Sequence, residues 1–381
     1  MRLSRKPVAT MTVALSITLL AACSSGTTGS ESTSPSPSTS ATQCGETVEQ
    51  IAASAKAEGD VNLIALPDTW ANYAGILKSF RDAYGLAAPV ADLDATSAEE
   101  LTTAKDPTAS NHPDALDIGS SFTEQAESEN LLSPYKTTNW AEIPDNLKDP
   151  DGNWVGSYFG VMSFGSNEKV VKNAPKTWAD LKKPEYKGQV TLSGDPRESG
   201  TAFASVAAAA LANGGSYDDV MQGIAYFADL RRSGNLSITE VTEQGLESGS
   251  IPIALDWSYN FPAAAAKLEE AGTELAVHFP KDGLYGAYYA QAAVSNAAHP
   301  CGARLWLEHI TGDVGALGYI EGGAIPARYA AMAKAGVITD EMKSELPSQG
   351  LIEKITFPSS AQNKAMNEQV AQNWGPMVAD Q

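Results

Sequence analysis

Three carboxylates stand directly after runs that predict β-strands. Asp195 and Glu198 follow one such run, and Asp256 follows another. A carboxylate in a closed cleft is costly unless it meets a cation or strong hydrogen-bond donors. These three acids are therefore candidates for contact with cationic groups of a ligand. The alternative for the first two is structural, because Glu198 can cap a helix and Arg197 can neutralise Asp195.

The residues that follow Glu198 support a competing interpretation. Ser199, Gly200 and Thr201 stand at the start of a predicted helix. Backbone N–H groups at a helix N-terminus and the helix dipole favour an anion. The same stretch can therefore cradle a phosphonate, a phosphate or a carboxylate, so that a cationic and an anionic ligand both remain open.

Two aromatic side chains stand where they can flank a ligand. Trp70 and Tyr73 come directly after the first predicted strand. Aromatic faces attract ammonium groups, and each contact contributes roughly 0.5 to 2 kcal/mol. Packing at a helix start is the alternative role for both residues.

Short β-rich runs alternate with helical runs along the chain. Apolar spacing predicts extended segments at 61–66, 89–93, 115–118, 154–164, 189–192 and 251–255, and helices at 73–84, 97–103, from Thr177, after 199–201 through Leu211, at 217–231 and at 261–271. This order predicts an α/β fold with a mostly parallel sheet covered on both faces. Ligands of such sheets bind just beyond the carboxyl ends of the strands. The length of 381 residues predicts two such modules.

The N-terminal residues predict export. Basic residues precede a short apolar run that ends in Leu-Ala-Ala-Cys23, and these are the parts of a secretory signal. The last four residues resemble the lipobox of bacterial lipoproteins. We expect a signal peptide at 1–22, a lipid on Cys23, and a disordered Ser/Thr/Pro tether that completes the stretch 23–43. An ordinary signal peptide is the alternative.

The remaining cysteines predict one disulfide. If Cys23 carries a lipid, Cys44 and Cys301 are left, and an even remainder in an exported protein favours a bond between them. This bond would join the start of the fold to a point far along the chain. Two separate buried thiols are the alternative.

Charge and motifs exclude several classes of function. The chain has 26 Lys and Arg against 46 Asp and Glu, for a net charge of −20, which argues against nucleic-acid binding and against electrostatic docking on anionic lipid. The sequence contains no nucleophile elbow, P-loop, dinucleotide-binding or zinc-protease motif. Its four histidines lack metal-ligand spacing: His112, His278, His299 and His309. We expect a monomeric binding protein, not an enzyme, without metal or cofactor.

One stretch of the chain resembles a known family. The residues PKTWADLKKPEYKG at 175–188 resemble the motif that opens the second lobe in the periplasmic solute-binding proteins of ABC importers. Further pieces follow in the same order: DPRESGT at 195–201, FPKDG at 279–283, VSN at 294–296 and GGAIP at 322–326. The branch that looks most similar includes spermidine/putrescine-, ferric iron-, thiamine- and aminophosphonate-binding proteins.

The resemblance implies a fold, a location and partners. It implies the type II periplasmic-binding-protein fold, with two α/β lobes that close on a ligand at a hinge. Lobe 1 is expected at 45–164 plus 285–325, and lobe 2 at 165–284 plus 326–381. The implied protein is exported, is anchored to the outer face of the cell membrane through its lipid alone, and delivers a small molecule to the permease subunits in the membrane.

The resemblance also implies ligand contacts and leaves the ligand open. Polyamine-binding members have W-x-x-Y where this chain has Trp70 and Tyr73, D-x-R-E where it has Asp195 and Glu198, and a Trp near Trp257. The other implied contacts are Ser120, Ser121, Ser199, Thr201, Asp256, Tyr285 and Tyr288. The chain departs from the polyamine pattern, because Ala290 replaces an Asp and Phe122 replaces a Tyr.

A polyamine-like cation is the expected ligand, and several alternatives remain. Ser-Gly-Thr at 199–201 resembles phosphonate-type members, which favours an aminophosphonate or phosphate-type anion. Tyr288 and Tyr289 resemble the paired tyrosine ligands of ferric-ion binders. Thiamine is a further alternative within the same role. An exported hydrolase and an adhesive surface lipoprotein are the alternatives from other classes.

Overall fold

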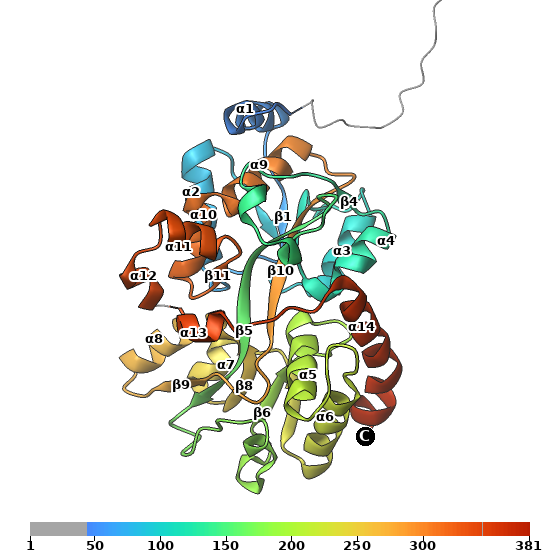
Figure 1. Cartoon of the computed structure of the whole chain (residues 1–381), viewed down its shortest axis with the longest axis vertical. Coiled ribbons are helices and arrows are strands. Elements are labelled where there is room, and N and C mark those ends of the chain that lie inside the picture. The colour runs from blue at the N-terminus through green and yellow to red at the C-terminus, as the bar shows by residue number, and fades with distance from the viewer. Residues whose placement is uncertain (1–43, 345) are drawn as a thin grey trace, which may run out of the picture. The chain divides into compact units, whose positions relative to one another are not determined.

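Two long strands run through the middle of the fold, β5 (Val155–Asn167) and β10 (Gly286–Val294) (Figure 1). The computed structural model describes residues 44–344 and 346–381. Residues 155–161 of β5 pair antiparallel with β10, whereas residues 162–167 pair with β8 and β9. A single strand therefore belongs to two groups of strands.

These two groups divide the nine-stranded sheet. The first consists of β10 with β3 (Ala115–Gly119), β4 (Leu132–Ser133) and β11 (Ile325–Pro326), and a separate parallel pair, β1 (Leu63–Ile64) with β2 (Val90–Ala91), lies beside it. The second consists of β6 (Val190–Ser193), β7 (Leu236–Thr239), β8 (Ile253–Trp257) and β9 (Leu275–His278). We call these groups, with the helices that cover them, lobe 1 and lobe 2. The residue ranges expected for the lobes stay a prediction.

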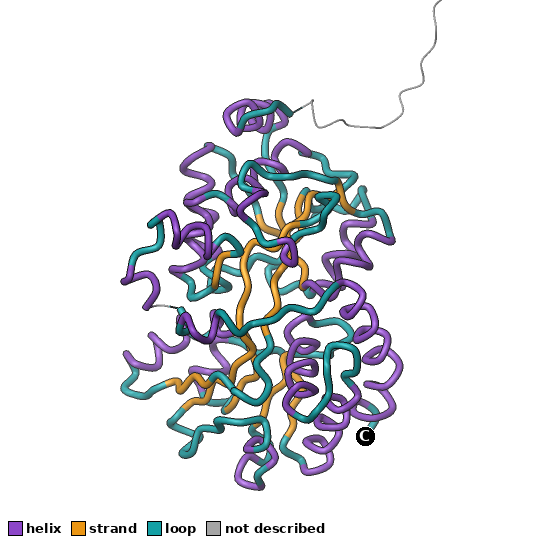
Figure 2. The backbone as a smooth tube through the Cα atoms, viewed as in Figure 1, coloured by secondary structure: helices purple, strands orange, loops and turns teal. Residues whose placement is uncertain are grey.

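Helices lie outside the strands in both lobes (Figure 2). Those of lobe 1 are α1 (Val48–Glu58), α2 (Tyr73–Tyr84), α3 (Ser97–Lys105), α4 (Thr123–Ser128), α9 (Pro300–Thr311), α10 (Asp313–Glu321), α11 (Tyr329–Ala335) and α12 (Asp340–Ser344). Those of lobe 2 are α5 (Gly200–Ala212), α6 (Met221–Ser233), α7 (Glu243–Ser248) and α8 (Pro262–Glu270). In the part of the chain that the structure describes, no helix has the length and apolar character needed to cross a bilayer.

The C-terminal segment contacts both lobes. It contains α13 (Gln349–Ile352), α14 (Ser360–Trp374) and a final π-helical turn (Gly375–Ala379). On α14, Asn363 donates to the carbonyl of Ser120 in lobe 1 at 3.3 Å, and Gln369 accepts from the N–H of Val220 in lobe 2 at 2.9 Å. This helix therefore ties the lobes together in addition to β5 and β10.

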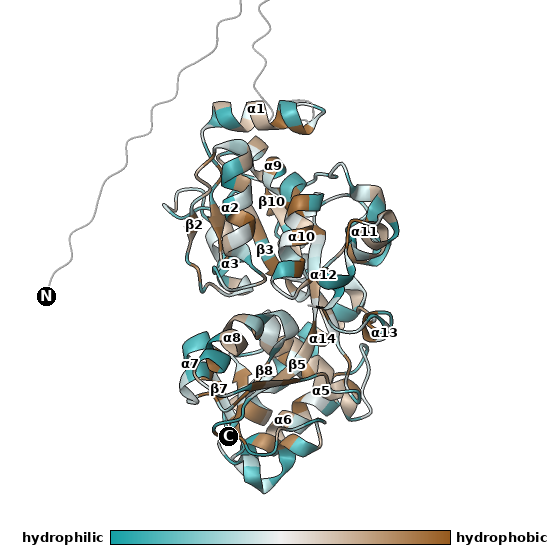
Figure 3. Cartoon of the chain, turned by 90° about the vertical axis from the view of Figure 1, so that its left-hand side faces the viewer, coloured by the Kyte–Doolittle hydropathy of each residue, from teal (hydrophilic) through white to brown (hydrophobic). Residues whose placement is uncertain are grey.

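Buried apolar side chains form the core of the described residues. In Figure 3, many residues of the strands have the brown colour of hydrophobic residues. All thirteen residues of β5 are buried, as expected for a strand covered on both faces. Most of the predicted segments are found, and the helix predicted at 73–84 has the same bounds as α2.

Three expectations about the elements are wrong. The sheet is mixed, because β5 and β10 run antiparallel to their neighbours while β6, β7 and β8 are parallel. The helix expected from Thr177 is only a 3-10 turn (Asp180–Lys182), since Pro184 disfavours helical geometry at the residue before it. The helix expected from Tyr217 begins at Met221, because Ser216 and Asp219 form a bridged turn.

A close approach of α5 and α6 gives a stability prediction. A Cβ atom at Gly223 on α6 would overlap the carbonyl oxygen of Val206 on α5, and backbone cannot give way easily. We expect Gly223→Ala to lower the free energy of unfolding by about 1–3 kcal/mol. Urea unfolding measures this. In the matched variant Gly350→Ala, the added methyl group meets nothing within 4 Å, and the helix propensity of Ala should leave stability unchanged or raise it. Equal stabilities of the two variants would contradict the prediction.

Candidate functional site

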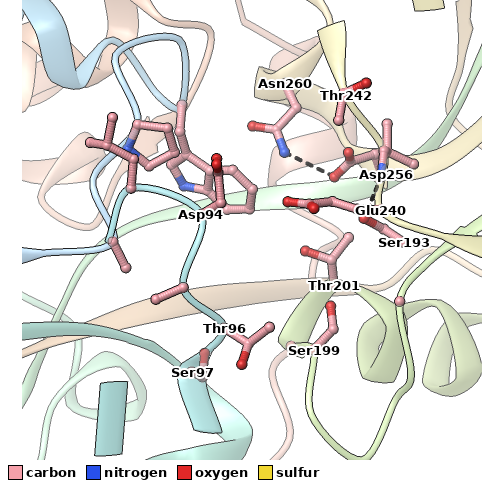
Figure 4. Close-up of a pocket in the computed structure, with 18 of the residues that line it drawn as sticks. Asp94, Thr96, Ser97, Ser193, Ser199, Thr201, Glu240, Thr242, Asp256 and Asn260 are labelled. Atoms are coloured by element: carbon pink, nitrogen blue, oxygen red, sulfur yellow. Dashed lines mark hydrogen bonds between the residues drawn. The ribbon is translucent and has the colours of Figure 1, made fainter. Parts of the chain in front are cut away.

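A cleft of about 530 Å³ lies where strands of both lobes end. Lobe 1 contributes the loop after β1, the start of α3 and one residue of β3. Lobe 2 contributes the loops after β6, β7 and β8. In Figure 4, Thr96 and Ser97 of lobe 1 lie across from Ser199 and Thr201 of lobe 2. The cleft therefore occupies the position at the carboxyl ends of strands where α/β sheets bind ligands, and its volume suits a small molecule.

Carboxylates dominate the charge of this cleft. Nine of its lining residues are acidic: Asp94, Glu99, Glu100, Asp117, Asp195, Glu198, Glu240, Glu243 and Asp256. No lysine, arginine or histidine is among the residues that line it in the described part of the chain. Arg197 and Lys267, which do not line the cleft, pair with Asp195 and Glu243. The remaining acids produce a negative potential that attracts cations.

Asp256 is a buried acid of lobe 2 that accepts two hydrogen bonds. It ends β8 next to Trp257, and its side chain is buried. Its Oδ1 atom accepts from the backbone N–H of Trp257 at 2.7 Å and from Nδ2 of Asn260 at 2.9 Å (Figure 4). Burial raises the pKa of Asp256 to about 7, although both donors lower it. A cation in the cleft would favour the charged form of this carboxyl.

Glu240 lies across the cleft from acids of lobe 1. It follows β7, and its pKa is raised by partial burial and by the charges of Asp94 and Glu99. Because β7 belongs to lobe 2 and the other two acids precede or open α3 of lobe 1, like charges of the two lobes repel each other here.

Trp70 and Tyr73 take different positions. Trp70 is half-buried and lines the cleft, where its ring meets Tyr259 and Tyr289 edge to face at 5.5 and 5.3 Å. Its Nε1 donates to the hydroxyl of Tyr158 at 2.6 Å. Tyr73 does not line the cleft; it is fully buried at the start of α2, and its hydroxyl donates to Asp117 at 2.7 Å. The structure thus brings only the first of the pair to the cleft wall.

Asp195 and Glu198 also line the cleft, but Asp195 has a protein partner. Arg197 donates to both carboxylate oxygens of Asp195, at 2.9 and 2.6 Å. Burial alone would raise the pKa of Asp195, yet these bonds lower it below its usual value. Glu198 is exposed and lies just before α5. Of these two acids, Glu198 is the one that faces solvent.

Ser199 and Thr201 lie at the start of α5 and line the cleft. Ser199 is the N-cap, because its Oγ accepts from the N–H of Ala202 at 3.3 Å. Thr201 is buried, and its hydroxyl lies 3.4 Å from the hydroxyl of Tyr289 on β10. The helix start therefore borders the cleft, and both ligand interpretations stay predictions.

The other predicted contacts surround a separate, much smaller space of about 10 Å³. Ser120, Ser121, Trp257, Tyr285 and Tyr288 are all buried around it. Tyr288 stacks on Trp154 at 5.4 Å between ring centroids, whereas its neighbour Tyr289 lines the main cleft. Both tyrosines border the smaller space, but only Tyr289 lines the main cleft, because successive residues of a strand point to opposite faces.

Cys44 and Cys301 form a disulfide in the structure, with Cα atoms 5.3 Å apart. In the described residues, the only cluster of three side chains with metal-ligating atoms joins these two cysteines to Glu58, and the disulfide occupies both sulfurs. Cys23 and the tether lie outside the described residues.

Six acids of the cleft were not predicted from the sequence: Asp94, Glu99, Glu100, Asp117, Glu240 and Glu243. Asp117 carries a readable signal, since it interrupts the apolar strand Ala-Leu-Asp-Ile-Gly and is buried. Glu240 follows a strand, β7, that apolar spacing did not predict.

Comparison with known proteins places the chain among solute-binding proteins. Residues 113–344, more than half of the chain, match the family described as "Bacterial extracellular solute-binding protein". An uncharacterized protein of Haemophilus influenzae is 36% identical over 118 residues, which cover 28% of this chain and 34% of that protein. The spermidine/putrescine-binding periplasmic protein of Escherichia coli is 27% identical over 161 residues, which cover 40% of this chain and 44% of that protein. Both matches span less than half of the relative's length.

A solved structure shows the same fold. The periplasmic binding protein AfuA of Actinobacillus pleuropneumoniae, determined with fructose-6-phosphate bound, aligns with a TM-score of 0.68 and 18% identity, over 84% of this chain and 99% of that one. This likeness establishes the type II periplasmic-binding-protein fold expected from the sequence. The matched family, the Escherichia coli relative and AfuA are described as binding proteins and not as enzymes. Residues 113–344 of this chain match the family model, and the chain therefore belongs to the bacterial extracellular solute-binding protein family.

Proposed function

We propose that the protein is the solute-binding component of an ABC importer and that it captures a small organic cation. In this proposal a lipid on Cys23 holds it at the outer face of the cell membrane, where it delivers the ligand to the permease. Family membership supports the importer role. The observation that carries the ligand class is the cleft wall, which has nine carboxylates and no basic side chain among its described residues.

A sugar phosphate fits this wall poorly. The AfuA structure holds fructose-6-phosphate, and the start of α5 offers N–H groups to an anion here as well. Asp195 and Glu198 lie directly before those groups, and only Asp195 is neutralised, by Arg197. An anionic ligand would also face Asp256 and Glu240 without any compensating cation from the wall. A cation would instead be attracted by Glu198, Glu240 and Asp256, none of which has a basic partner on the cleft wall.

Closure also favours a cation. Asp94 and Glu99 of lobe 1 repel Glu240 of lobe 2. A ligand drives closure only if it interacts more favourably with the closed state than with the open one. A cation between these acids replaces repulsion by attraction as the lobes approach, so that binding and closure become coupled.

A calorimetric ligand screen tests the proposal. The purified folded domain is titrated with putrescine, spermidine, thiamine, 2-aminoethylphosphonate, fructose-6-phosphate and ferric citrate. We expect binding of at least one of the two polyamines with a dissociation constant in the range of about 1 μM, near −8 kcal/mol. Binding of fructose-6-phosphate or of iron, with no response to any organic cation, would overturn the ligand class.

Trp70 gives a prediction for the aromatic wall. Trp70 lines the cleft, so Trp70→Ala should lower the affinity for a bound ammonium compound about 5- to 30-fold, the loss of about 1–2 kcal/mol. Trp140 is also half-buried but lies away from the cleft, where its ring contacts Lys136 and Lys148. The control Trp140→Ala should keep the wild-type dissociation constant. Similar losses of affinity in both variants would point to a general loss of folding instead.

A further inference from the structure

Two acids on the lobe 1 side of the cleft have no role in the site described so far. Asp117 lies in β3 and Glu100 in α3, and both line the cleft. Their exposed fractions are only 4% and 1%. Acids as buried as these are rare unless they are paired with a cation or fully hydrogen-bonded.

Hydrogen bonds within the protein satisfy only some of the carboxylate oxygens of these two acids. Asp117 accepts at Oδ2 from the hydroxyls of Tyr73 at 2.7 Å and Tyr158 at 3.1 Å. Glu100 accepts at Oε2 from the backbone N–H of Asp117 at 3.0 Å. The other oxygen of Asp117, Oδ1, is buried and has no hydrogen-bond partner among the described residues. Gln291 faces the same network, but its Nε2 donates to Tyr73.

Among the described residues, no positively charged group lowers the pKa of either acid. The titratable groups around Asp117 are Glu100 and the hydroxyls of five tyrosines from both lobes: Tyr73, Tyr158, Tyr259, Tyr289 and Tyr319. Burial raises the pKa of Asp117 to about 7 and, together with the charge of Asp117, raises that of Glu100 well above its usual value. A cation close to these two acids would favour their charged forms, so its binding should release protons.

We propose that Glu100 and Asp117 form a second cation subsite, and that the ligand carries at least two cationic groups, one held here and the other at Asp256. This inference rests on the proposed function. One subsite belongs to lobe 1 and the other to lobe 2, so a dication that reaches both contributes to closure from both sides. A ligand with a single cationic group fills one subsite and leaves the other acid unpaired.

Comparison of a diamine with a monoamine of equal length tests the inference. Putrescine and n-butylamine are titrated into the wild-type domain, into Asp117→Asn and into Glu100→Gln. We expect the wild type to bind putrescine at least about 30-fold more tightly than n-butylamine, since a charged hydrogen bond contributes about 2 kcal/mol or more. In Asp117→Asn, putrescine should fall to within about threefold of n-butylamine, whose own affinity should change less than threefold. Asp151→Asn, which removes an equal charge from an exposed turn, should bind like the wild type.

Protons released on binding provide an independent readout. Titrations at pH 7 in two buffers of different ionisation enthalpy should show proton release with putrescine in the wild type and less release in Asp117→Asn. If Asp117→Asn does not fold, Glu100→Gln carries the same comparison. Equal affinities of the wild type for the two amines, or an unchanged preference in both variants, would overturn the subsite. If the wild type binds neither putrescine, spermidine, thiamine nor n-butylamine, the proposed ligand class is wrong and the subsite with it.

Discussion

Asp256→Asn is expected to lower the affinity for a bound diamine about 30- to 150-fold at pH 8, because it removes a charge-assisted hydrogen bond of about 2–3 kcal/mol. The substitution keeps the shape of the side chain. The N–H of Trp257 and the Nδ2 of Asn260 both donate to Oδ1 of Asp256, and the amide oxygen of an Asn can accept from the same two donors. The loss of affinity would therefore report the charge and not a rearranged pocket. Calorimetric titration of putrescine measures it.

Without ligand and at high pH, Asp256→Asn should be more stable than the wild type. Burial raises the pKa of Asp256 in the folded state to about 7, above its unfolded value near 3.8. Its contribution to folding is therefore fully present below pH 4 and is lost as the pH rises through about 7. Ligand affinity follows the opposite course and should rise from pH 5.5 to pH 8, because a cation binds the ionised carboxyl. At pH 8, we expect Asp256→Asn to unfold at a higher temperature than the wild type.

Asp195→Asn is the matched control for this pH dependence. Arg197 outweighs the effect of burial and holds the pKa of Asp195 below its usual value, so this carboxyl stays ionised from pH 5.5 to pH 8. Asp195→Asn should keep the wild-type slope of affinity against pH, whereas Asp256→Asn should show a shallower slope. Some slope will remain, since the pKa of Asp117 is also raised to about 7. Identical slopes in the two variants would show that Asp256 does not exchange its proton with the ligand.

Local patterns allowed much of the fold to be predicted. The helix at 73–84 was predicted with its observed bounds because apolar spacing is strong there and Gly85 ends the helix in a left-handed conformation. Strand direction was not predictable in the same way. The largely apolar sequences of β5 and β10 do not indicate in which direction each strand runs relative to its neighbours. The sheet is mixed because these two strands pair antiparallel with the strands beside them.

The candidate site was predictable only where it follows the ends of predicted strands. Asp195, Glu198 and Asp256 come after such strands, and all three line the cleft. Trp70 and Tyr73 lie three residues apart, yet Trp70 lines the cleft, whereas Tyr73 is buried and donates a hydrogen bond to Asp117. Their positions depend on which side of the loop meets the core. The pairing of Glu100 with Asp117 depends on the packing of α3 against β3, which no local pattern encodes.

Loss of the disulfide should have the largest effect on stability. The bond between Cys44 and Cys301 spans 257 residues of sequence and encloses most of both lobes. In the chain-entropy model, a loop of this length contributes roughly 5 kcal/mol by restricting the unfolded chain. We expect Cys44→Ser with Cys301→Ser to lower the free energy of unfolding by about 3–5 kcal/mol in urea. A change below about 1 kcal/mol would mean that the unfolded chain is already restricted without the bond.

The same double variant separates stability from ligand binding. Neither cysteine lines the cleft, and Glu58 still accepts hydrogen bonds from the N–H groups of residues 301 and 302 at 2.9 and 3.1 Å, which hold α1 against α9. The folded variant should therefore bind putrescine within about twofold of the wild type at 25 °C, a difference below about 0.5 kcal/mol. Asp256→Asn predicts the reverse combination, weak binding with higher stability at pH 8. If the folded double variant loses affinity as well as stability, the disulfide affects the folded, ligand-binding protein and not only the unfolded chain. That outcome would contradict the assignment of the ligand to this cleft alone.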